Sequence, residues 1–280
     1  MRKNSIEVRG KRGEEAALSR SRFTFFKPLM RCVAAVGLAL LMTIPARAQF
    51  DGKKGKDFGL WMTVGMEKKI NKKWSVGLEF EYRLKDNIEE GKSWGAPARW
   101  NVAVEADYKP LSWLKFDAGY KFMRDYSLAE WDEEDQEETE AFWCSKHRVF
   151  FSATGSYKVS NFKFALRERW QYTYRPEVAD VTYDWEHDRL EPKKGKGKNV
   201  SRTRLMVSYD KKKAWYEPYV SVEMYLAEGI EKMRYTAGCE FKLSKHDEID
   251  VFYRYQDITD DDCYNDRDSH IVGVGYKFRF

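Results

Sequence analysis

Strict alternation of apolar and polar residues over long segments is the feature that most constrains how this chain can fold. In the segment 74–85, large apolar residues stand at the even positions and small or polar residues at the odd ones. A period of two places successive side chains on opposite faces of a β-strand. The pattern continues from Phe58 to the end of the chain, and we therefore expect an all-β protein.

Three further features distinguish a membrane barrel from a soluble sandwich, which also alternates. The predicted strands run for about 10–13 residues, enough for a tilted strand to cross a bilayer, whereas soluble strands average about 5–6. Short turns near 71–73, 109–112, 158–161, 210–214 and 244–247 alternate with longer polar loops near 86–97, 126–143, 176–199, 227–231 and 259–267. Aromatic residues gather at strand ends, at Trp74, Trp100, Tyr108, Trp113, Tyr157, Phe162, Tyr172, Tyr174, Tyr209 and Trp215. Together these features predict an antiparallel transmembrane β-barrel with aromatic girdles.

The number of strands needs a separate argument, because the pattern gives eleven segments while single-chain bacterial barrels have an even number. Either residues 49–57 pass through the lumen, or a strand within 126–143 or 176–199 has been missed. We therefore expect 10–12 strands, with a slight preference for twelve.

The first 48 residues have the pattern of a leader with a secretory signal peptide. A basic flank precedes the apolar run Cys32–Met42, and Ala46-Arg47-Ala48 matches the small-x-small pattern of a signal peptidase site. The apolar run is too short to cross a bilayer as a helix. We expect the mature protein to begin near Gln49, with an N-terminal segment 49–57 and a barrel from 58 to 280; translation could start at Met1 or Met30.

Composition excludes several other classes of protein. The formal net charge is +5, but residues 1–48 carry +7 and the remainder −2, so the mature chain has no basic excess for nucleic acid. An aromatic content of 16% argues against disorder. Four cysteines are too few for a disulfide-dense scaffold.

Several short motifs resemble a known family. They are Asp57-Phe-Gly-Leu-Trp61, Glu79-Phe-Glu-Tyr-Arg83, Ser201-Arg-Thr-Arg-Leu205, Glu217-Pro-Tyr-Val-Ser-Val-Glu223, Met233-Arg-Tyr-Thr-Ala-Gly238 and His270-Ile-Val-Gly-Val-Gly275. Over about residues 57–280 the chain is similar to the outer-membrane family catalogued as domain of unknown function 2490. The resemblance implies a barrel in a Gram-negative outer membrane and carries over no activity. The acidic insert 130–140 and the Lys/Gly-rich 193–198 are not part of that pattern.

Parity assigns many charged residues to the lumen. The basic ones are Arg83, Arg99, Lys115, Lys121, Arg148, Lys163, Arg167, Arg169, Arg202, Arg204, Arg234 and Arg254; the acidic ones are Glu67, Glu79, Glu81, Glu105, Asp107, Asp117, Glu223, Glu240 and Asp250. A ring of one sign would indicate a small selective channel. Because both signs interleave and so few strands leave a narrow lumen, we favour a lumen closed by ion pairs.

One ion pair can be placed by register. If the turn between segments 200–210 and 215–226 is centred near Lys212–Lys213, Arg202 lies opposite Glu223 and Arg204 opposite Ser221. Arg202 and Glu223 are therefore expected to pair in the lumen, and the barrel should conduct poorly.

An alternative is a lipid-modifying enzyme acting on lipopolysaccharide acyl chains, somewhat like a lipid A deacylase. Ser145 and His147 share a lipid-facing side, where His could activate Ser as a nucleophile. In that enzyme type His precedes Ser, however, and no carboxylate that would orient the His is identified. We therefore favour a protein that is not an enzyme.

Metal, cofactor and disulfide signals are weak. The acidic clusters 132–138 and 257–268 suggest calcium, but calcium loops need ligands at fixed offsets and a Gly at the sharp turn, which the second cluster lacks. We favour solvated external loops that bridge divalent ions to lipopolysaccharide. His187 with Asp184 and Asp188 is a poor metal motif, so the sequence indicates no specific metal and no cofactor. If a disulfide forms, it should join Cys144 to Cys263 and leave Cys239 free. Expected partners are outer-membrane lipids, lipopolysaccharide and, through the C-terminal Phe280, the barrel assembly machinery, but no nucleic acid.

Overall fold

The computed structural model describes residues 57–85, 96–127, 130–132, 137–211, 214–259 and 268–280, all within the compact unit Lys54–Phe280. The expected leader, its cleavage site and residues 49–56 therefore lie outside the described residues. No helix in the described part of the chain is long and apolar enough to span a membrane.

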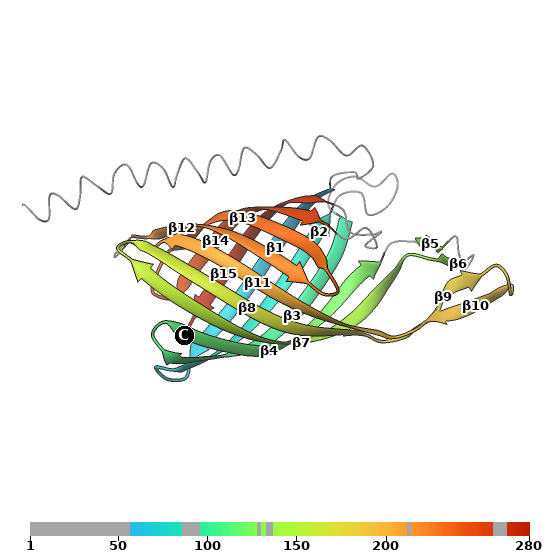
Figure 1. Ribbon diagram of the computed structural model, residues 1–280, viewed down its shortest axis with the longest axis horizontal. Coiled ribbons are helices and arrows are strands. Elements are labelled where there is room, and N and C mark those ends of the chain that lie inside the picture. Colours follow the sequence, from blue (N-terminus) through green and yellow to red (C-terminus); the bar gives the residue numbers. More distant parts are fainter. Residues whose placement is uncertain (1–56, 86–95, 128–129, 133–136, 212–213, 260–267) are drawn as a thin grey trace, which may run out of the picture. The chain divides into compact units, whose positions relative to one another are not determined.

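The described residues form fifteen β-strands, and eleven of them close into a barrel in the order β1-β15-β14-β13-β12-β11-β8-β7-β4-β3-β2 (Figure 1). The barrel strands are β1 (Asp57–Lys69), β2 (Trp74–Lys85), β3 (Ala96–Leu111), β4 (Leu114–Ser127), β7 (Phe142–Val159), β8 (Phe162–Arg175), β11 (Lys196–Tyr209), β12 (Tyr216–Leu226), β13 (Ile230–Lys242), β14 (Asp247–Ile258) and β15 (Ser269–Arg279). They contain 11 to 18 residues each. These lengths confirm the prediction of a transmembrane barrel.

The barrel closes through a parallel pair of strands. β1 pairs with β15 from Asp57↔Ser269 to Glu67↔Arg279, whereas all other neighbouring strands are antiparallel. Eleven strands lie within the expected range of 10–12, but the preference for twelve is not met. An even number is required only if the first and last strands are antiparallel, and here they are not.

The two segments suspected of hiding a barrel strand contain shorter strands of a separate sheet. These are β5 (Glu130–Asp132), β6 (Glu137–Thr139), β9 (Val178–Asp184) and β10 (Arg189–Lys193), in the order β10-β9-β6-β5. β9 and β10 form a hairpin between β8 and β11 (Figure 1). The Thr139 and Thr182 hydroxyls, 3.1 Å apart, link the loops that follow β4 and β8.

The barrel is apolar outside and polar inside, the reverse of a soluble protein. Large apolar side chains at alternate positions are exposed, among them Val64, Leu78, Phe80, Val104, Leu166, Leu205, Val220, Val251 and Val274. The charged side chains of Asp117, Asp125 and Glu223 are buried. Lipid around the barrel accounts for this arrangement, because hydrocarbon replaces water as the outer solvent.

Short turns lie at one end of the barrel, and the longer connections lie at the other. In the first turn, the Asn71 side chain accepts hydrogen bonds from the backbone N–H groups of Lys73 (2.8 Å) and Trp74 (2.9 Å), the hydrogen-bonding that favours Asn in turns. The turn between β7 and β8 places Ser160 at a φ of 56°. Next to these turns, Trp74 stacks on Tyr108 with ring centroids 4.6 Å apart, as expected for a girdle.

Candidate functional site in the barrel lumen

The lumen contains a cavity of about 850 Å³ lined mostly by charged and polar side chains. All of the charged residues that parity assigned to the lumen line this cavity, except Lys163. Alternation is therefore a good guide to orientation, because a membrane strand has only two environments to alternate between. Parity did not single out charged residues near the strand ends, such as Asp125, Lys146 and Lys277, which also line the cavity.

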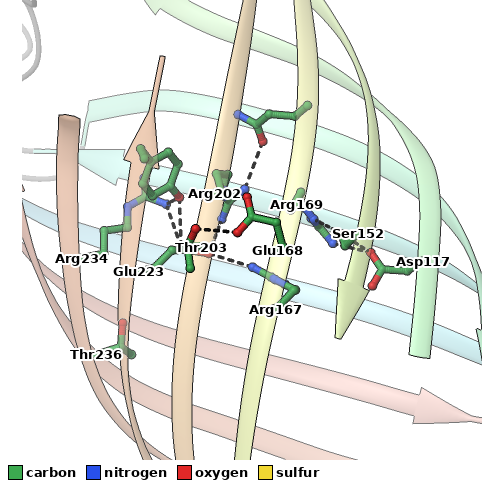
Figure 2. A network of polar contacts seen from close by, with 12 residues as sticks. Asp117, Ser152, Arg167, Glu168, Arg169, Arg202, Thr203, Glu223, Arg234 and Thr236 are labelled. Carbon is green, nitrogen blue, oxygen red and sulfur yellow. Dashed lines mark hydrogen bonds and ion pairs between the residues drawn. The ribbon is translucent and has the colours of Figure 1, made fainter. Parts of the chain in front are cut away.

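Glu223 on β12 is the centre of the best-connected group in the lumen (Figure 2). Its Oε1 accepts hydrogen bonds from Arg167 Nη2 at 2.7 Å and from Arg202 Nη2 at 2.9 Å. Its Oε2 accepts one from the Tyr225 hydroxyl at 3.1 Å and lies 4.0 Å from Arg234 Nη1. One carboxylate thus lies beside arginines from β8, β11 and β13.

The register between β11 and β12 differs from the prediction by two residues. Arg202 lies opposite Tyr225, and Arg204, which was expected opposite Ser221, lies opposite Glu223. The structure still brings Arg202 and Glu223 together, because the long arginine side chain reaches the carboxylate diagonally. The predicted register was wrong because it assumed a turn centred near Lys212–Lys213. The observed pairing corresponds to a turn centred one residue later in the chain.

Two further carboxylates are held in the same way on the wall formed by β2, β3, β4 and β7. Asp117 Oδ2 accepts hydrogen bonds from Arg169 Nη2 at 2.8 Å and Ser152 Oγ at 2.7 Å (Figure 2). Glu81 Oε1 accepts one from Arg83 Nε at 2.8 Å and one from the Asn101 side chain at 2.6 Å. Charge-assisted hydrogen bonds of this kind offset the cost of taking the charges out of water.

Aromatic rings inside the lumen were missed from sequence. Trp61 stands on the polar face of β1, and the guanidinium carbons of Arg83, Arg254 and Arg234 lie 3.6, 4.9 and 5.2 Å from its ring centroid. Tyr225 has Arg202 and Arg234 at 4.5 and 4.6 Å. The sequence did contain a signal for them: each is a large aromatic residue on the strand face whose other residues are mostly small or polar.

Charge in the lumen changes along the barrel axis. Toward the short-turn end, carboxylates are more frequent, and Lys115 and Asp107 pair at 2.7 Å, as do Lys277 and Glu67 at 3.0 Å. Beyond that end, Lys158 donates a hydrogen bond to Asp210 and holds the pKa of this carboxyl below its ordinary value. The middle of the lumen is richer in arginine.

On the lipid-facing side, the residues of the enzyme hypothesis do not act as a pair. Ser145 Oγ accepts a hydrogen bond from Arg124 Nη1 at 3.0 Å, and His147 Nδ1 lies 2.6 Å from the Tyr120 hydroxyl. Within the described residues, Ser145 and His147 are not hydrogen-bonded to each other. Farther along the barrel wall, the exposed Glu168 accepts a hydrogen bond from Thr203 Oγ1 at 2.5 Å (Figure 2).

The proposed disulfide stays a prediction. Cys144 is buried and Cys239 half-buried, both with free thiols, while Cys263 lies outside the described residues. Cys144 lies opposite Asp125 on the lumen side.

The hairpin residues considered as a weak metal motif form a turn instead. Asp184 Oδ1 accepts hydrogen bonds from the backbone N–H groups of Glu186 (2.9 Å) and His187 (3.0 Å), and Asp184 Oδ2 lies 2.7 Å from His187 Nδ1. Burial raises the pKa of Asp184, but these contacts with His187 lower it more, to a net value below the ordinary one. Among the described residues, no group of three or more His, Cys, Asp or Glu side chains could hold a metal ion.

Comparison with known proteins agrees with this fold. The model of the family described as "Protein of unknown function (DUF2490)" matches residues 58–265. The β domain of the Bordetella autotransporter BrkA is 13% identical with a TM-score of 0.50, over 72% of this chain and 79% of that one. The translocator domain of the autotransporter NalP from Neisseria meningitidis is 10% identical with a TM-score of 0.44, over 80% of this chain and 91% of that one. No protein of curated function matches the sequence. At such low identities, the structural similarity concerns the outer-membrane barrel fold alone.

Proposed function

This chain belongs to the family described as a protein of unknown function (DUF2490), and we propose that it is a non-enzymatic outer-membrane barrel whose narrow lumen is closed by ion pairs. The proposal includes export through the signal peptide and residence in a Gram-negative outer membrane. It also includes contact with lipopolysaccharide and recognition of the C-terminal Phe280 by the barrel assembly machinery.

The burial of side chains that point into the lumen supports a closed barrel most strongly. The exposed fractions of Trp61, Glu223, Tyr225 and Arg234 are 6%, 5%, 4% and 8%. Side chains that line a wide aqueous pore would be accessible to water from within. Here the contacts connect β8 to β12 through Arg167–Glu223 and β13 to β1 through Arg234–Trp61. The network therefore extends over much of the wall at this level.

Conductance in planar bilayers tests the closed lumen. We expect purified wild-type protein to give a small conductance, because ion-paired side chains narrow the middle of the lumen. Trp61→Ala should raise the conductance by removing the ring that three arginines contact. Phe80→Ala, which removes an exposed outward-facing ring, is the matched control and should not. A large, stable conductance in the wild type would overturn the proposal.

Two further measurements test the location and the absence of enzymatic activity. The protein should fractionate with outer membranes and migrate differently before and after boiling, as folded barrels do. Lipid A from cells with and without the protein should have the same acylation pattern by mass spectrometry. Recovery in the soluble periplasm would refute the location, and a changed acylation pattern would refute the non-enzymatic assignment.

A further inference from the structure

Two adjacent rows of lumen residues cross the strands β8, β11, β12 and β13 with an unusual concentration of positive charge. In strand order, the first row is Arg167, Arg204, Glu223 and Arg234, and the second is Arg169, Arg202, Tyr225 and Lys232. Six of these eight positions are cationic and one is a carboxylate. Figure 2 shows Arg167, Arg169, Arg202, Glu223 and Arg234 on this wall.

Like charges lie directly opposite each other in this patch. Arg202 pairs in register with Arg169, and Arg204 with Arg167. Such cross-strand pairs are destabilising unless an anion compensates them. The carboxylates within reach are Glu223, which is shared by Arg167 and Arg202, and Asp117, which binds Arg169. These contacts leave Arg204 without an ion-pair partner among the described residues.

Several guanidinium donors of the patch have no acceptor. Arg167 Nε and Arg202 Nε are buried without a hydrogen-bond partner, and the Arg204 side chain makes no hydrogen bond to any described residue. Arg148, in the same cavity, donates Nε only to the Thr173 hydroxyl, at 2.8 Å. Buried donors without acceptors are costly, and a native protein normally satisfies them. The missing acceptors indicate a ligand that carries oxygen atoms and negative charge.

We propose that this arginine patch, Arg167, Arg169, Arg202, Arg204 and Arg234, is a binding site for a small soluble oxyanion, a carboxylate or phosphate compound. Planar guanidinium groups match the geometry of these two anions. The cavity of about 850 Å³ is large enough for a small organic ligand. The ligand is soluble, because the patch faces the lumen and bilayer lipids contact only the outer wall. The inference deepens the proposed function, on whose lumen it rests.

Isothermal titration calorimetry of the folded, detergent-solubilised protein with inorganic phosphate tests the site. Citrate is the carboxylate probe, maltose the neutral control, and sodium chloride at matched ionic strength the control for screening. We expect saturable binding of phosphate or citrate, with no saturable heat from maltose or chloride. This comparison needs no variant.

Arg204→Gln is the most informative variant, because it removes a cation that makes no ion pair with the described residues. It should weaken phosphate or citrate binding about tenfold or more, as expected for the loss of a charge-assisted hydrogen bond. Lys277→Gln makes the same change of charge in the lumen, but at the short-turn end beside Glu67, and should leave the affinity unchanged. Arg204→Lys keeps the charge without the guanidinium fork and should bind with intermediate affinity.

Two outcomes would overturn the site: heats from phosphate and citrate no different from those of chloride, or an equal loss of affinity in Arg204→Gln and Lys277→Gln. The test is independent of conductance. If the barrel conducts freely yet binds phosphate, the closed lumen is refuted and the binding site is supported. If the barrel is closed and binds no oxyanion, the closed lumen is supported and the binding site is refuted.

Discussion

At the scale of single residues, Glu223 is the carboxylate whose loss should cost the most. It accepts hydrogen bonds from two arginines and lies 4.0 Å from a third. Glu223→Ala leaves these buried cations without their shared acceptor, and removing one partner of a buried pair costs about 3–5 kcal/mol. We therefore expect the free energy of unfolding to fall by that amount in urea titrations of the protein in lipid vesicles.

The double variant Arg202→Ala with Glu223→Ala should be less destabilised than Glu223→Ala alone, because one of the stranded cations is also gone. Arg202→Ala alone should cost less than Glu223→Ala, since Arg167 still binds the carboxylate at 2.7 Å. Glu79, 47% exposed and 3.5 Å from Lys121, is the control, and Glu79→Ala should cost no more than about 1 kcal/mol. Strictly additive effects of the two substitutions would show that the charges act separately.

At the scale of strands, the sequence predicts orientation better than pairing. Alternation identifies all eleven barrel strands and the lumen side of Arg202 and Glu223, because each strand has one lipid face and one lumen face. It does not determine how far neighbouring strands slide, which is why the β11–β12 register was wrong by two residues, a shift that preserves the faces. The excess of arginine across β8 and β11 could not be seen from the sequence, because it depends on the register between these two strands, which the β9–β10 hairpin separates in the chain. The parallel seam was missed because no local pattern encodes which strands close a barrel.

A disulfide across this seam tests the parallel closure. Thr63 lies opposite Gly275, and a Cβ atom on Gly275 would be 4.0 Å from the Thr63 Cβ, within the range of about 3.5–4.5 Å found in disulfides. With the native cysteines replaced by serine, Thr63→Cys with Gly275→Cys should cross-link on oxidation. The closed loop makes the denatured chain more compact, so it should migrate faster on a non-reducing gel.

The matched control pairs Thr63→Cys with Thr154→Cys, whose register partners are Lys115 and Arg167 and not any residue of β1. It should stay reduced. Failure of the seam pair to cross-link, or equal cross-linking of both pairs, would contradict the direct pairing of β1 with β15.

At the scale of the whole barrel, an odd number of strands places the start of β1 and the end of β15 at opposite ends of the barrel. Asp57 begins β1 at the end with the long connections, and Phe280 ends the chain at the short-turn end, where its backbone N–H donates to Glu67 O at 2.9 Å. In outer-membrane barrels, short turns face the periplasm and longer loops face the outside. The β9–β10 hairpin should therefore lie at the cell surface, and the acidic end of the lumen should open toward the periplasm.

Cysteine labelling in intact cells tests this direction. Glu186 is exposed between β9 and β10, on the side of the long connections. Lys72 is exposed in the turn between β1 and β2, at the short-turn end of the barrel. In a background without native cysteines, a membrane-impermeant maleimide should label Glu186→Cys in intact cells. Lys72→Cys should react only after the outer membrane is permeabilised, because the bilayer separates it from the reagent. The opposite labelling pattern would mean that the barrel is inserted the other way round. The acidic, short-turn end of the lumen would then face the outside of the cell.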